Sequence, residues 1–166
     1  MSRLDSFIRR MQAQRDCLNA VADDVRSLSG PILELGLGNG RTYDHLRGLF
    51  PGRDIYVFER QVRAHPDCIP PDDRLFLGDI FETLPRAIAQ LGATAALAHS
   101  DLGTGEAAAN RALGRRLAPA LDALMASGGL VVANQEFAVA GWRRLPDPTG
   151  VPPGRYFLYR KSGALT

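Results

Sequence analysis

Three glycines at alternating positions, Gly36, Gly38 and Gly40, lie where apolar strand-like residues give way to a helical pattern. Gly36 permits a tight turn, Gly38 removes the Cβ that would keep a ligand from the backbone, and Gly40 lets the chain enter the helix. The N-terminal amides of that helix then face the ligand. Although glycine-rich turns also occur without a ligand, this one predicts a site for a nucleoside-containing molecule.

Acidic and polar residues end the other predicted strands. Glu59 ends the next strand, 19 positions after Gly40, where a carboxylate can accept hydrogen bonds from both ribose hydroxyls. Asp79 ends the third predicted strand, His99-Ser100-Asp101 follows the fourth, and Asn134 follows the fifth. These side chains are the candidates for binding and chemistry.

The elements that must position them follow from apolar spacing. An amphipathic helix is predicted over residues 3–28, with Leu4, Ile8, Met11, Leu18, Ala22, Val25 and Leu28 on its apolar face. The remaining patterns predict strands over 31–35, 55–58, 74–77, 93–98 and 130–133, helices over 42–50, 81–91 and 105–127, and a hairpin of 142–145 with 156–159. Pro119 is expected to kink or divide the third of these helices. The crossover helix over 65–73, which contains three prolines, is expected to be short or absent, and none is expected between the fifth strand and the hairpin.

Alternating strands and helices indicate an α/β fold with a doubly wound, mostly parallel sheet. In such a sheet ligands bind beyond the carboxyl ends of the strands, where the strand order reverses. We expect one domain over residues 1–166, made of an N-terminal helix (1–30), a cofactor-binding core (31–136) and a terminal β-hairpin (137–166).

Composition narrows the class of protein. The chain has 166 residues, of which 45% are apolar and 23% charged, as in one globular domain with a substantial core. Its net charge of +2 is not gathered into a basic stripe, which argues against nucleic acid as a partner. No apolar run is long enough for a membrane span and no secretory signal opens the chain, so a cytoplasmic location is expected. The single lysine, Lys161, is far from the glycine turn, which excludes a P-loop ATPase.

Two nucleoside cofactors compete for the glycine turn. Dinucleotide enzymes use G-x-G-x-x-G, whose last glycine allows close packing of helix on strand, but Arg41 stands at that position. The run Glu34-x-Gly36-x-Gly38-x-Gly40 instead resembles the first motif of class I S-adenosylmethionine-dependent methyltransferases. Glu59 and Asp79 fall where that family has its second and third motifs, so the resemblance covers about residues 30–136. It implies a Rossmann-like, seven-stranded sheet with reduced helices and an antiparallel last strand.

The resemblance also implies which residues bind S-adenosyl-L-methionine. Glu34 would support the methionine amino group, Glu59 the ribose hydroxyls, and Asp79 the adenine amino group, with the Ile80 amide facing the ring. His99 and Ser100 would pass beneath the methyl that is transferred. The full cofactor-binding set is Glu34, Gly36, Leu37, Gly38, Asn39, Gly40, Thr42, Glu59, Arg60, Gly78, Asp79, Ile80, His99 and Ser100.

Methyl transfer needs alignment of a nucleophile with the methyl group and sometimes a base. His99 and Asp101, next to the expected sulfur, are the candidate catalytic residues. An alternative places a divalent cation on Asp101 and Asn134, as in catechol-type methyltransferases. Ala133 replaces the further aspartate of that family, and no metal site is predicted.

The acceptor is expected to be a small molecule. His99-Ser100-Asp101-Leu102 does not match the Asn/Asp-Pro-Pro-aromatic motif of amino-methylating DNA enzymes. The terminal hairpin and the long N-terminal helix are compatible with a homo-oligomer. Two other functions stay open: an NAD(P)-dependent oxidoreductase, and a catalytically silent subunit that binds S-adenosylmethionine for a partner.

Overall fold

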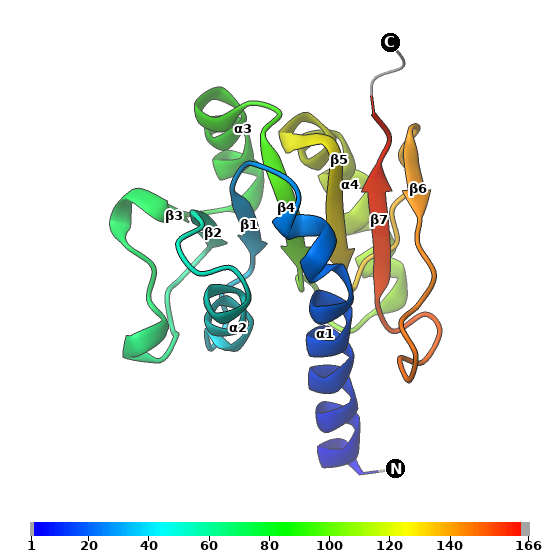
Figure 1. The fold of residues 1–166 in the computed structure, drawn as a ribbon. Coiled ribbons are helices and arrows are strands. Elements are labelled where there is room, and N and C mark those ends of the chain that lie inside the picture. The colour runs from blue at the N-terminus through cyan, green and yellow to red at the C-terminus, as the bar shows by residue number, and fades with distance from the viewer. Residues whose placement is uncertain (1, 164–166) are drawn as a thin grey trace.

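The computed structural model describes residues 2–163, in which seven strands form one sheet with helices on both faces (Figure 1). The helices are α1 (Arg3–Arg26), α2 (Arg41–Leu49), α3 (Ile80–Leu91) and α4 (Ala107–Leu124), with short 3₁₀ helices at Pro66–Cys68 and Asp72–Arg74. The strands are β1 (Ile32–Leu35), β2 (Ile55–Glu59), β3 (Leu75–Leu77), β4 (Ala95–Ser100), β5 (Met125–Ala133), β6 (Trp142–Arg144) and β7 (Phe157–Lys161).

The strand order is β3-β2-β1-β4-β5-β7-β6, and the first five strands are mutually parallel. β7 pairs antiparallel with β5 and with β6, which confirms the predicted doubly wound, Rossmann-like sheet with an antiparallel terminal hairpin. The order reverses between β1 and β4, where Leu35 lies level with both Phe58 and Ser100. The carboxyl ends of β1, β2 and β4 therefore meet at one crevice.

The core has two layers because the central strands are buried on both faces. Every residue of β1 and β4 is buried. α1 and α2 pack on one face, over side chains such as Ile32 and Leu130, and α3 and α4 cover the other, over Leu33 and Val131. The sequence of a parallel strand that is covered on both faces is a continuous apolar run, which is why these strands could be predicted from the sequence.

α1 packs into the apolar core through its C-terminal half. Its start is fixed by a capping box between Ser2 and Asp5, and the face that it turns to the core is buried from Ala13 onward. The predicted apolar face is wrong for the first two turns, because Leu4 is 65% exposed and Ile8 44% exposed. In Figure 1 this part of α1 extends beyond the carboxyl ends of β4 and β5.

Several boundaries differ from the prediction by one or more residues, and two of these differences change how the sheet is understood. β4 extends through His99 and Ser100, which were expected after the strand. β5 begins at Met125 and runs through Gly128 and Gly129, which were expected to end α4. A register shift in the β4–β5 pairing lies beside these glycines, and a Cβ on Gly129 would come within 2.9 Å of two carbonyl oxygens and a methionine side chain. The glycines thus serve an irregular strand and not a helix end.

Pro119 lies inside α4 and does not divide it, so the predicted division is wrong. The residue is exposed, so water can satisfy the carbonyl that loses its helical partner.

Among the described residues, no helix combines the length and apolar character needed to cross a membrane.

Candidate functional site

The turn between β1 and α2 has the backbone that its glycines predict. Gly36, Gly38 and Gly40 all have positive φ, at +90°, +52° and +90°. No heavy atom lies within 4 Å of a Cβ built on Gly38, whereas one on Gly40 would lie 2.4 Å from the Cβ of Cys68. Gly38 therefore keeps space open beside the turn, and Gly40 permits close packing against the segment after β2.

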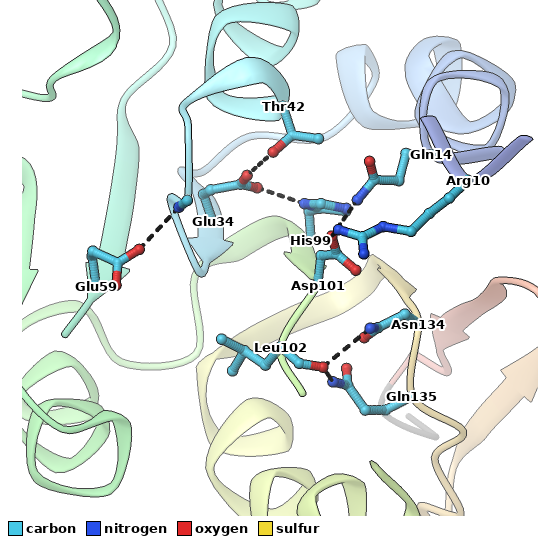
Figure 2. Close-up of polar contacts among 11 residues, drawn as sticks. Arg10, Gln14, Glu34, Thr42, Glu59, His99, Asp101, Leu102, Asn134 and Gln135 are labelled. Atoms are coloured by element: carbon cyan, nitrogen blue, oxygen red, sulfur yellow. Dashed lines mark hydrogen bonds and ion pairs between the residues drawn. The ribbon is translucent and has the colours of Figure 1, made fainter. Parts of the chain in front are cut away.

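Glu59, at the end of β2, closes onto the same turn. One carboxylate oxygen accepts from the backbone amides of Leu37 and Gly38 at 2.9 and 3.0 Å. The other accepts from the amides of Arg60 and Gln61 at 2.7 and 3.3 Å. Figure 2 shows the carboxylate reaching across to the glycine turn. These contacts fix the distance between the ends of β1 and β2.

A cavity of about 310 Å³, here called the glycine-loop cavity, opens at this point. It brings together Gly36, Leu37, Gly38, Asn39, Thr42 and Glu59 from the predicted cofactor set, with the predicted catalytic residue Asp101. The sequence reasoning missed the lining residues from α1 and from the segment after β4, which are Arg10, Met11, Gln14, Leu102 and Gly103, as well as Arg41. The available signal was that Arg10 and Gln14 stand one helical turn apart beside apolar positions.

Glu34 and His99 lie beneath the glycine turn and line neither of the two cavities beside it. Both are completely buried, on the adjacent strands β1 and β4. One Glu34 oxygen accepts from the Thr42 hydroxyl, and the other lies 2.7 Å from His99 Nδ1 (Figure 2). Burial lowers the pKa of His99, but the charge and hydrogen bond of Glu34 outweigh it, so the pKa is raised above 6.5. The pair ties β4 to the start of α2.

The predicted adenine-binding residues form a separate group at the start of α3. Asp79 caps the helix by accepting from the Phe81 amide at 2.9 Å, and its other oxygen pairs with Arg60 at 3.3 Å. Gly78, Asp79 and Ile80 are half-buried and lie outside the glycine-loop cavity. Ser100 is buried, and its hydroxyl donates to Gln135 at 2.9 Å.

Asp101 marks the border between the glycine-loop cavity and a second one. Its carboxylate accepts from the Arg10 guanidinium at 2.9 Å and from the Gln14 amide at 2.6 Å (Figure 2). The second cavity, of about 690 Å³, shares Arg10, Asp101 and Gly103 with the first. We call it the hairpin-side cavity, because the loop between β6 and β7 forms one wall.

The segment after β4 is held by the end of β5. The Leu102 carbonyl accepts from the side-chain amides of Asn134, at 3.1 Å, and Gln135 (Figure 2). The contacts of Asp101 are cationic or amide donors, an arrangement unlike the clustered oxygen ligands of a magnesium site. In residues 2–163 no group of three or more His, Cys, Asp or Glu side chains could hold a metal ion.

Comparison with known proteins identifies the family of the chain. Residues 1–161 match the S-adenosyl-L-methionine methyltransferase family. The chain is similar to the crystal structure of an S-adenosyl-L-methionine methyl transferase from Silicibacter pomeroyi, with 49% identity and a TM-score of 0.92 over 98% of this chain and 99% of that one. No curated protein sequence matches it.

A more distant likeness supports the fold. A putative methyltransferase, yhhF, from Escherichia coli superimposes with a TM-score of 0.63 at 14% identity, over 91% of this chain and 86% of that one. The family match contradicts the alternative of an NAD(P)-dependent oxidoreductase and confirms that S-adenosylmethionine is the cofactor. The chain belongs to the S-adenosyl-L-methionine methyltransferase family.

Proposed function

We propose that this methyltransferase binds S-adenosylmethionine in the glycine-loop cavity and methylates a small molecule in the hairpin-side cavity. The observation that carries the proposal is that the two cavities meet at Asp101. A cofactor in one and an acceptor in the other would then face each other at a single point, as displacement at a methyl group requires.

The residues of the glycine-loop cavity suit the cofactor. The open space at Gly38 admits a ligand to the backbone, and Glu59 supplies a carboxylate for ribose hydroxyls. Since four backbone amides already use the lone pairs of Glu59, ribose binding requires it to exchange some of these contacts. Asp79 and the start of α3 are assigned to the adenine, beyond the cavity edge.

S-adenosylmethionine, when bound, supplies a methyl group made electrophilic by a sulfonium. The protein must then align the nucleophile, exclude water and, for a protonated acceptor, remove a proton. Asp101 is the carboxylate at the cavity border, and we assign it to orient the acceptor and accept its proton. Arg10 and Gln14 hold that carboxylate in place from α1.

His99 is assigned a different role from the one its position in the sequence predicted. A completely buried imidazole that contacts Glu34 has no access to an acceptor in either cavity. We propose that it positions Glu34, and through Thr42 the glycine turn. Glu34 then acts on the cofactor side through this turn, since both of its oxygens are engaged.

The size of the hairpin-side cavity favours a small-molecule acceptor. Its 690 Å³ lies within the roughly 300–1,000 Å³ typical of small-molecule sites. Helix α1, the start of α4 and the β6–β7 loop all contribute to its lining.

The cytoplasmic location and the homo-oligomer stay predictions from the sequence.

Calorimetric titration with S-adenosylhomocysteine tests the cofactor site. We expect Glu59→Gln to weaken binding by about 1–3 kcal/mol, because it removes a charged acceptor while keeping the side-chain shape. The matched control is Glu82→Gln, since Glu82 is exposed on α3 and outside both cavities. If the Glu59 variant and wild type bind S-adenosylhomocysteine with equal affinity, the assignment of Glu59 to the cofactor site is contradicted. If wild type binds it but methylates no acceptor, the alternative of a catalytically silent subunit is favoured.

A further inference from the structure

The hairpin-side cavity has an electrostatic character that the methyltransferase assignment does not explain. Arg111 from α4 and Arg155 from the β6–β7 loop both line it. Within residues 2–163 neither guanidinium has an ion-pair or hydrogen-bond partner, whereas Arg10 is paired with Asp101. Glu136 is the one further carboxylate in the lining. The wall therefore offers two unneutralised cations to a ligand.

The start of α4 adds to this positive character. Ala107, its first residue, lines the same cavity, and Glu106 at the cap position makes no side-chain hydrogen bond to the helix. The first amides of an α-helix have no partner within the helix, and the aligned dipole favours negative charge there. An 18-residue helix that begins at a cavity wall is thus a recognised setting for an anion.

Buried polar atoms without partners point to a ligand at this place. Tyr156 is 1% exposed and lines the cavity, and its hydroxyl faces Gln14 and Asp101 without a well-formed hydrogen bond to any of residues 2–163. The side-chain oxygens of Asn110 and Asn134, in the same lining, are also buried without a donor, and as acceptors they suit a hydroxyl, an amine or a water and not the anionic group itself. Since leaving a buried polar group unpaired destabilises the fold, a ligand or ordered water is needed to satisfy these atoms.

Tyr156 is suited to donate to that ligand. Burial, with a smaller contribution from the Asp101 charge, raises the pKa of its hydroxyl. The group thus stays a phenol at neutral pH and can donate to a ligand atom beside Asp101, whereas the guanidinium groups of Arg111 and Arg155 can donate to an anion.

Resting on the proposed function, we propose that the methyl acceptor is a small anion whose carboxylate or phosphate binds Arg111, Arg155 and the start of α4. The rest of the molecule reaches Asp101, where the hairpin-side cavity meets the glycine-loop cavity. Anion binding at one end and the reacting atom at the other would then select the acceptor by charge as well as by size.

Binding of probe anions tests this without knowledge of the acceptor. Benzoate and phenyl phosphate represent the two anion types, and benzamide is the neutral match for benzoate. Each is titrated by NMR into wild type, Arg111→Gln, Arg155→Gln and Arg115→Gln, with and without S-adenosylhomocysteine. Arg115 is the control because it is exposed on the same helix and outside both cavities.

We expect at least one anion to bind wild type and Arg115→Gln saturably, with shifts at the start of α4. Each cavity variant should weaken binding at least about tenfold, as expected for loss of a charge-assisted hydrogen bond. The proposal would be overturned if neither anion bound wild type at concentrations up to about 50 mM, or if benzamide bound as tightly as benzoate. Unchanged anion affinity in both Arg111→Gln and Arg155→Gln would also overturn it. If wild type binds the anions as expected but does not bind S-adenosylhomocysteine, the cofactor assignment is contradicted and the anion site is not.

Discussion

At the scale of single residues, the site depends on a buried charged pair. Glu34 and His99 are both fully buried, and their contact joins β1 to β4 directly below the glycine turn. The sequence identified both residues but assigned His99 to chemistry, because a histidine at a strand end suits a general base as well as a structural contact. Only the three-dimensional arrangement shows that its partner is Glu34, 65 positions away.

The pair makes stability depend on pH in a defined direction. Because the folded-state pKa of His99 is raised above 6.5, its contribution is fully present below pH 6.5 and is lost as pH rises through the folded pKa. Glu34→Gln should reverse this dependence, because burial alone lowers the pKa of His99, and should cost about 3–5 kcal/mol at low pH, since it leaves the buried imidazole without its counter-charge. Denaturant unfolding of both proteins across this range measures the difference. A gap between them that widens with rising pH would contradict the assignment.

At the scale of elements, the turn between β1 and α2 requires its glycines for two separate reasons. Gly38 faces open space, while Gly40 combines a φ of +90° with the contact to Cys68. The sequence predicted a ligand turn from the spacing of these glycines. It could not predict the contact, because the segment containing Cys68 has no regular pattern and its three prolines only exclude a long helix.

Gly40→Ala therefore tests packing at the turn. We expect it to destabilise the fold by about 2–4 kcal/mol, because it adds a strained φ to a steric clash. Gly48→Ala is the matched control: it lies inside α2 with no atom near its Cβ position, and should stabilise by about 0.5–1 kcal/mol. Urea denaturation distinguishes the two, and a Gly40 variant as stable as wild type would show that the turn is not constrained.

At the scale of the whole molecule, the sheet could be predicted from the sequence because each strand carries its own apolar signal. The cavities could not, since they form from segments whose proximity no local pattern encodes. The hairpin-side cavity combines α1, the start of α4 and the β6–β7 loop. The N-terminal half of α1 was expected to pack on the core, but it contributes Arg10 and Gln14 to the site instead.

The position of α1 predicts which of its residues become more protected from hydrogen exchange when the cofactor binds. Its last three turns are fixed in the core, so the first half is attached to the body at the site mainly through Asp101. Hydrogen exchange should be faster over residues 6–12 than over 18–25, and S-adenosylhomocysteine should slow exchange in the first range only.

Arg10→Gln should reduce that protection while changing overall stability by less than about 1 kcal/mol, because Arg10 is half-exposed in its ion pair. Arg15→Gln serves as the control, since Arg15 pairs with the neighbouring Asp16 and lines neither cavity. If cofactor binding protects residues 6–12 equally in both variants, α1 is held by something other than Arg10. If cofactor binding protects residues 6–12 in none of the three proteins, wild type included, then α1 is a fixed wall of the site and does not respond to the cofactor.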